Sequence, residues 1–144
     1  MRERGESLLE LVVAIGLMGV AIVAVMSGLT TTVLMSDVQR KEATAGTTVR
    51  DYAEALQKYV ADGHYVACAS SYAVPGFVPP DGFTARVVSG SVQYWTGALW
   101  LPLCLPDRGV QRLRVSVAST DGRAAESLDV VLRKPCRPED PPCS

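Results

Sequence analysis

The stretch that decides the fold is MRERGESLLELVVAIGLMGVAIVAVMSGLTTTVLMS, residues 1–36. A short charged segment ends at Gly5, and an uncharged apolar run from Leu11 to Ser36 follows the single acid Glu10. A helix of this length measures roughly 35–40 Å, enough to cross a hydrocarbon core of about 30 Å. The run therefore predicts a transmembrane helix. A carboxylate at its mouth has no obvious packing role, so Glu10 predicts a partner of opposite charge.

The spacing of Gly5, Glu6 and Glu10 before the apolar run resembles the N-terminal segment of type IV pilins and of type II secretion pseudopilins. In that family the prepilin peptidase, a membrane aspartyl peptidase, cuts after the glycine, and the new amino group is methylated. The resemblance implies cleavage between Gly5 and Glu6, methylation of Glu6, and an assembly role for Glu10. The family usually begins its mature chain with phenylalanine, and this chain has Glu6 there.

The resemblance implies a function as well. It points to a minor pilin or pseudopilin, a structural subunit of a type IV pilus or a type II secretion-like filament. The implied partners are the prepilin peptidase, other pilin or pseudopilin subunits, the inner assembly platform and membrane lipid. The implied location is the cell membrane, crossed once, with the C-terminal domain outside the cytoplasm and assembled into an extracytoplasmic filament.

Two other interpretations of the N-terminal segment stay open. The first alternative is a plain signal anchor. The second is a signal peptide cleaved within 21–28, although the apolar run exceeds the 7–15 residues typical of signal peptides. A signal anchor would give a single-pass protein that displays an extracellular binding domain stapled by disulfides. Arg2 and Arg4 before the run balance Arg40 and Lys41 after it, so the flanking charges do not decide the orientation.

After Ser36 the composition becomes mixed in charge, and apolar residues recur at helical spacing. This stripe is expected to pack on the domain, and it comprises Val49, Tyr52, Ala53, Leu56, Tyr59 and Val60. No proline interrupts residues 6–62, which favours one continuous helix that stops at Asp62-Gly63. Its weak point is Gly28, where any local unwinding would begin.

Strand signals begin near residue 84. We expect a tight hairpin around Gly90, a short or edge strand interrupted by Pro102, and a long hairpin turning at Thr120-Asp121-Gly122. The first strand of the long hairpin alternates, with Val110, Leu113, Val115 and Val117 as its expected buried residues. The predicted fold class is α+β: a long N-terminal helix, transmembrane then amphipathic, packed on a small antiparallel sheet of four or five strands. This is also the pilin-like fold.

We expect the chain to divide into six segments. In chain order the segments are a leader (1–5), the transmembrane and assembly half of the helix (6–36), its amphipathic half (37–62), a connecting loop (63–83), an antiparallel sheet (84–134) and a Pro/Cys tail (135–144).

The four cysteines all follow the apolar run, and an even count in an exported domain predicts disulfides with three possible connectivities. We favour Cys68–Cys104, which ties the loop after the helix to the sheet, and Cys136–Cys143, which closes the tail. A zinc site is the alternative, because His64 and Cys68 have i, i+4 spacing. No CxxC pair supports it, so no metal or cofactor is predicted.

The 144 residues and the net charge of −1 indicate one small domain beside the membrane segment. No basic stripe suggests nucleic-acid binding. The single histidine, His64, lies in the loop without a nucleophile motif, so no enzyme is predicted. Trp95, Trp100 and Tyr94 are expected to pack the sheet. A weaker alternative is an adhesin or receptor domain in which the two tryptophans contact a ligand.

Overall fold

The computed structural model of the chain describes residues 6–136, with the backbone alone at residues 6, 7, 30 and 31. The chain divides into two units, one ending at Gln39 and one beginning at Arg40. The single long helix α1 runs unbroken from Glu6 to Tyr59, and a five-residue π-helical turn, Val60–His64, ends it. Gly63 takes a φ of 105°, a left-handed conformation that glycine adopts without strain. The predicted stop at Asp62-Gly63 is confirmed.

The second unit contains one five-stranded antiparallel sheet. Its strands are β1 (Phe83–Val87), β2 (Gln93–Trp95), β3 (Trp100–Leu101), β4 (Val110–Ser119) and β5 (Ala125–Arg133). The long strand β4 pairs with β5 along one side and with both β1 and β2 along the other, and β3 pairs with β2. The predicted α+β layout and the long hairpin, here β4–β5, are confirmed. The short strand before Pro102 is also confirmed as β3.

The predicted tight hairpin at Gly90 is wrong. β1 and β2 do not pair with each other; both run antiparallel to β4, one after the other along the same side. The amide of Val88 donates to the carbonyl of Arg114 at 2.8 Å, and the amide of Ser91 donates to the carbonyl of Val88 at 3.2 Å. These bonds hold the Gly90 turn against β4, so the turn moves the chain along β4 instead of reversing it. A ten-residue strand offers the two short strands more backbone partners than they offer each other.

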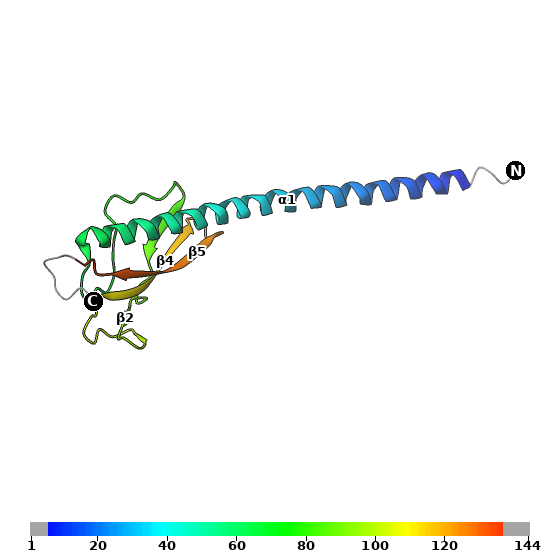
Figure 1. Ribbon diagram of the computed structural model, residues 1–144. Helices are drawn as coiled ribbons and strands as arrows, with labels where there is room; N and C mark the ends of the chain where they lie inside the picture. The colour runs from blue at the N-terminus through cyan, green and yellow to red at the C-terminus, as the bar shows by residue number, and fades with distance from the viewer. Residues whose placement is uncertain (1–5, 137–144) are drawn as a thin grey trace. The chain divides into compact units, whose positions relative to one another are not determined.

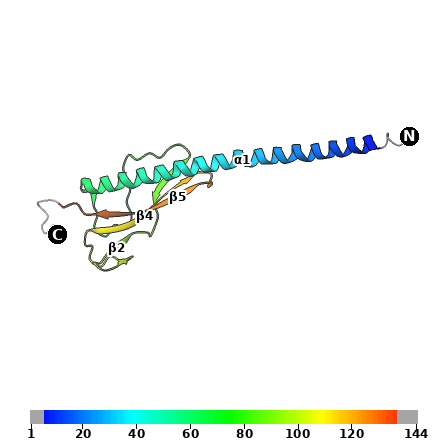
Figure 2. The ribbon, with the colours of Figure 1, turned by 45° about the vertical axis from the view of Figure 1, so that its right-hand side comes forward.

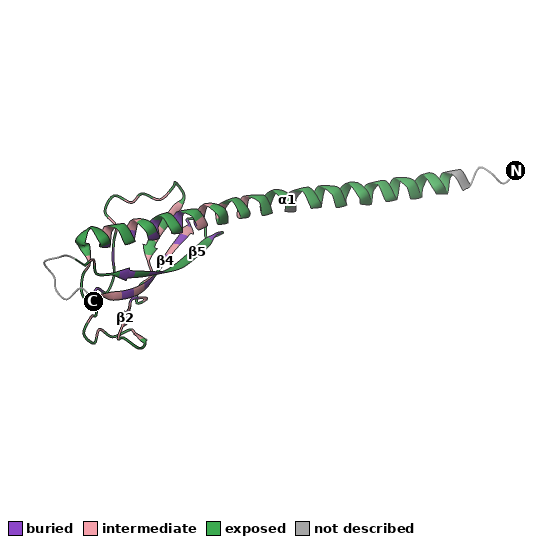
Figure 3. Cartoon of the chain, in the orientation of Figure 1, coloured by how far each residue is buried: buried purple, intermediate pink, exposed green. Residues whose placement is uncertain are grey.

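The core lies between the second half of α1 and the sheet, as the two ribbon views and the burial colouring show (Figures 1, 2 and 3). The predicted helical stripe is buried apart from Tyr59, which is half-buried. It packs on the inward side chains of the long hairpin, which are Leu113, Val115, Val117, Val130 and Leu132. Complete burial of a side chain such as Leu56 contributes about 1.5–3 kcal/mol. This packing fixes the helix on the sheet.

The turn between β4 and β5 is tied to the helix as well. The Lys41 ammonium lies 2.6 Å from the Asp121 carboxylate. Hydrogen bonds from Lys41 first, and then from Ser119 and the Arg123 amide, hold the pKa of Asp121 well below its usual range. Both side chains are partly exposed, so the pair orients the turn more than it stabilises the domain.

Candidate functional site

The first half of α1 presents apolar side chains to the outside. Its large aliphatic residues between Leu8 and Met35 are all exposed, and the most apolar part of the helix has no buried residue (Figure 3). One helix is therefore long and apolar enough to cross a membrane, judged by length and composition. In water such a surface would be unfavourable at every turn of the helix. This half requires an apolar environment supplied from outside the chain.

Glu10 lies exposed at the start of this apolar surface. Within the part of the chain that the structure describes, its carboxylate has neither a hydrogen bond nor an ion pair. A carboxylate that enters an apolar phase without a partner carries a large desolvation cost. The sequence-based expectation of an external partner for Glu10 therefore remains a prediction, and the structure leaves the carboxylate accessible for one.

The proposed processing site lies at the edge of the described region. Gly5 falls outside the described residues, and Glu6 is the first residue of α1, described by its backbone alone. Cleavage between Gly5 and Glu6 and methylation of Glu6 stay predictions.

The helix passes through its expected weak point without interruption. Gly28 lies inside α1, and the Thr32 hydroxyl donates a 2.9 Å hydrogen bond to the Gly28 carbonyl one turn earlier. Such a bond competes with the helical pattern and favours local bending. An added Cβ at Gly16, Gly19 or Gly28 would meet nothing within 4 Å. These glycines leave flat places on the apolar surface where another helix can approach closely.

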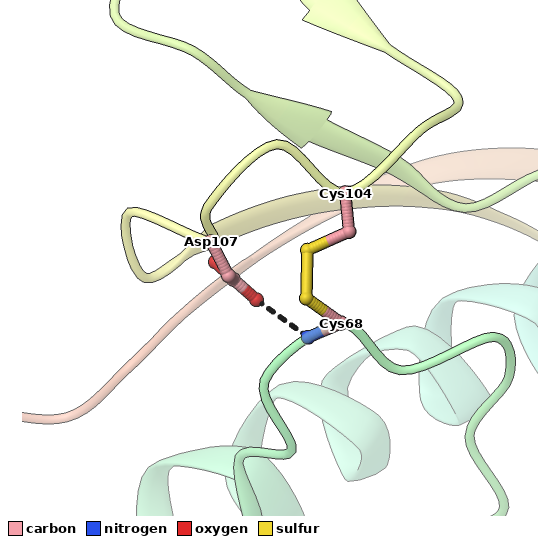
Figure 4. A group of neighbouring side chains, drawn as sticks. All are labelled: Cys68, Cys104 and Asp107. Carbon is pink, nitrogen blue, oxygen red and sulfur yellow. Dashed lines mark hydrogen bonds between the residues drawn. A yellow bond between two sulfur atoms is a disulfide. The ribbon is translucent and has the colours of Figure 1, made fainter.

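One predicted disulfide is confirmed. Cys68 and Cys104 are bonded, with their Cα atoms 5.6 Å apart and a separation of 36 positions in sequence (Figure 4). The bond joins the loop after α1 to the segment between β3 and β4. Cys136 is also disulfide-bonded. Its predicted partner, Cys143, lies outside the described residues.

A carboxylate beside this disulfide organises the two joined loops, and sequence reasoning missed it. Asp107 accepts hydrogen bonds from the Tyr65 hydroxyl at 2.7 Å, from the Cys68 amide at 2.9 Å and from the Gly109 amide at 2.8 Å. It accepts a fourth from the side-chain amide of Gln111 at 2.6 Å. Burial raises the pKa of Asp107, and these donors outweigh burial and lower it. Burial first, and then the hydrogen bond to Asp107 and the negative charge of that carboxylate, raise the pKa of Tyr65.

Gln111 extends this network into the core. The strand alternation predicted Val110 as buried, but Val110 is half-buried and Gln111 is fully buried. Its side-chain oxygen accepts from the Tyr72 hydroxyl at 3.0 Å, and its amide also donates to the Val66 carbonyl at 2.9 Å. A buried amide is tolerated only when its polar atoms are satisfied. The related signal in the sequence was the turn pattern at Asp107–Gly109. A turn pattern does not reveal hydrogen-bond donors that lie far away in the sequence.

The alternative zinc site does not match the arrangement of its residues. His64 stacks on the Tyr59 ring at 4.1 Å and contacts the Tyr59 carbonyl at 3.0 Å. The sulfurs of Cys68 and Cys104 and a carboxylate oxygen of Asp107 lie within 4.8 Å of one another. Both sulfurs belong to the disulfide, so neither provides the thiolate that zinc requires. Asp107 faces hydrogen-bond donors instead of a cation.

The aromatic residues divide between two faces. Tyr94 is buried, and its hydroxyl donates to the Ala69 carbonyl at 2.8 Å. Trp95 and Trp100 are half-buried and face each other across β2 and β3, with ring centroids 5.2 Å apart. The Arg112 guanidinium lies 4.9 Å from the centre of the Trp100 ring. The expectation of sheet packing is confirmed for Tyr94, whereas the tryptophans keep part of their surface exposed.

These features provide two candidate sites, the exposed apolar half of α1 with Glu10 and the partly exposed tryptophan pair. No family model, characterised protein or solved structure matches the chain, so the likeness to pilins rests on the residues of the N-terminal segment.

Proposed function

We propose that this protein is a structural subunit of an envelope-spanning filament, of the minor pilin or pseudopilin kind. The prepilin peptidase removes residues 1–5, and the helix holds the subunit in the membrane until assembly. In the filament, the apolar halves of neighbouring helices pack against one another. The folded domain beyond Arg40 stays outside the cytoplasm, where its cysteines are oxidised.

The observation that carries this proposal is the carboxylate of Glu10, which has no partner among the described residues and lies at the start of the exposed apolar half of α1. Cleavage after Gly5 creates an amino group at Glu6, which is cationic at neutral pH. The Glu10 carboxylate of one subunit pairs with the amino group of its neighbour. Each charge alone is costly inside an apolar bundle, so the pairing fixes the axial register of the subunits. Gly16 and Gly19 allow close approach between helices.

The experiment compares two carboxylate deletions on the same helix. Glu10→Ala removes the charge within the apolar half, and Glu42→Ala removes an exposed charge from the other half. Both variants should be processed and inserted in the membrane. Only Glu10→Ala should be lost from sheared or purified filaments, by about tenfold or more relative to the membrane pool. Normal assembly of Glu10→Ala rejects the register mechanism.

The alternative is a single-pass anchor that displays a disulfide-stapled binding domain. Two observations keep it open, the folded domain and its partly exposed tryptophan pair. Gly5→Leu discriminates between the two functions. If the protein is a filament subunit, the Gly5→Leu variant should accumulate with residues 1–5 still attached and should fail to assemble. If it is an anchor, the variant should differ in mass from the unsubstituted protein only by the substitution and should keep its surface display.

A further inference from the structure

The β2–β3 hairpin and the segment after it form an uncharged apolar surface. From Ser91 to Pro106 the sequence reads SVQYWTGALWLPLCLP, with no acidic or basic residue in it. Leu99, Leu103 and Leu105 are 51%, 69% and 58% exposed. The half-buried tryptophan pair belongs to β2 and β3 of the same segment. We call these three leucines and two tryptophans the hairpin patch.

The hairpin patch is held rigidly. Cys104 lies between two of its leucines and is bonded to Cys68, while Asp107 fixes the chain directly after it (Figure 4). The disulfide and the Asp107 hydrogen bonds restrain the segment that carries Leu103 and Leu105. Exposed apolar surfaces mark sites of interaction.

The turn at the tip of the hairpin is closed by hydrogen bonds between Thr96 and Leu99. The Thr96 amide donates to the Leu99 carbonyl at 3.1 Å, and the Thr96 hydroxyl donates to the same carbonyl at 3.0 Å. The Leu99 amide in turn donates to the Thr96 hydroxyl oxygen at 3.2 Å. Each internal hydrogen bond lowers the cost of moving its polar groups into an environment without water.

Arginines border the hairpin patch. Arg112 covers the Trp100 ring and donates to the Gln93 side chain. Arg108 is exposed, and an added Cβ at Gly97 would lie 3.0 Å from its Nη1 atom, so its guanidinium reaches the tip of the hairpin. No described residue forms an ion pair with Arg108. Its nearest acid in sequence, Asp107, is occupied by its own hydrogen-bond donors. The rim is positive and the centre is apolar.

We propose that the hairpin patch binds the surface of an anionic phospholipid bilayer. The leucines enter the upper acyl region, the tryptophans lie at the headgroup level, and Arg108 and Arg112 contact lipid phosphates. Tryptophan favours this interface because its ring is apolar and its N–H is polar. Apolar insertion and attraction to anionic headgroups together determine the binding strength of interfacial segments. The proposal is independent of filament assembly, since it concerns the folded domain alone.

The test uses the full chain, held by its helix in nanodiscs of phosphatidylcholine. Trp95 and Trp100 are the only tryptophans, so their fluorescence reports on the hairpin patch alone. Vesicles of phosphatidylcholine with phosphatidylglycerol, brominated on the acyl chains, are then added. Tryptophan emission should shift to the blue and be quenched, and brominated vesicles without phosphatidylglycerol should quench severalfold less. Arg108→Gln should weaken the response to phosphatidylglycerol about fivefold at low salt.

Two variants test whether the quenching depends on the leucines of the hairpin patch. The triple variant Leu99→Ser, Leu103→Ser, Leu105→Ser should lose the quenching, and Val78→Ser, which changes a residue 84% exposed outside the patch, should keep it. Absence of quenching in the unsubstituted chain overturns the proposal. So does equal quenching in the triple variant. Cross-linking of the hairpin to another copy of the chain, without quenching, would assign the patch to a protein contact instead.

Discussion

The two halves of α1 belong to one helix but are stabilised in opposite ways. From Ala45 to Val60 one stripe of the helix is buried on the sheet, and its other face is polar. From Leu8 to Met35 every described side chain is exposed, and the large ones other than Glu10 are apolar. The first arrangement is typical of a helix on a globular core, and the second of a helix in lipid or in a bundle. The contrast shows that the chain supplies the environment of only one half.

The largest effect on stability is expected from the disulfide, which belongs to the folded domain beyond Arg40. Replacing Cys68 and Cys104 by serine opens a loop of 36 residues and should cost the domain about 4 kcal/mol. Urea unfolding of the domain in detergent, followed by tryptophan fluorescence, measures this loss. Insertion of the helix into membranes should stay unchanged. A parallel loss of insertion would show that the two halves are not independent.

A pair of leucine substitutions tests the comparison directly. Leu56→Ala leaves a cavity under the sheet and should destabilise the domain by about 3 kcal/mol. Leu17→Ala removes the same atoms from the exposed half and should change domain unfolding by less than about 0.5 kcal/mol. The same urea titration measures both variants. Equal costs would contradict the assignment of the two halves to different environments.

The Asp107 network gives a smaller, pH-dependent effect. Asp107→Asn places an amide among groups that all donate, and should cost about 1–3 kcal/mol at neutral pH. Because the folded state lowers the pKa of Asp107, its stabilisation is complete above the ordinary carboxyl pKa and is lost as the pH falls through the lowered value. Unfolding midpoints measured from neutral to acid pH should fall less steeply for Asp107→Asn than for the unsubstituted protein. Identical slopes would remove Asp107 from this role.

The smallest effect is expected from the surface pair at the β4–β5 turn. Lys41→Ala removes the ammonium from Asp121 and should lower the unfolding midpoint slightly at low salt, with no difference at high salt. Thermal unfolding at two ionic strengths measures the change. A large, salt-independent loss would mean that Lys41, and not the apolar stripe, fixes the helix on the sheet.

The sequence predicted those structural elements that have a clear local pattern of apolar residues or cysteines. The helical stripe around Leu56 and the β4–β5 hairpin were predicted from spacing and composition. The bond between Cys68 and Cys104 was the pairing favoured among three possible connectivities. The pairing of β1 and β2 was not, because the partner strand β4 lies later in the chain and competes with the local hairpin.

The Asp107 network escaped prediction for a related reason. Its donors come from Tyr65 and Cys68, about forty residues earlier, and a Pro-Asp-Arg-Gly sequence resembles an ordinary exposed turn. Of the proposed assembly site, the sequence predicted Glu10 and the apolar surface. The predicted partner of Glu10 stays a prediction, because the proposed amine belongs to another molecule.

The decisive measurement for the filament proposal is the intact mass of the protein isolated from its native membranes. We expect a chain that begins at Glu6, shorter by Met1–Gly5, with an additional methyl group if Glu6 is modified. Its cysteines should be oxidised. A mass that retains the MRERG segment would contradict the proposal, because without cleavage no amino group exists at Glu6 to pair with Glu10.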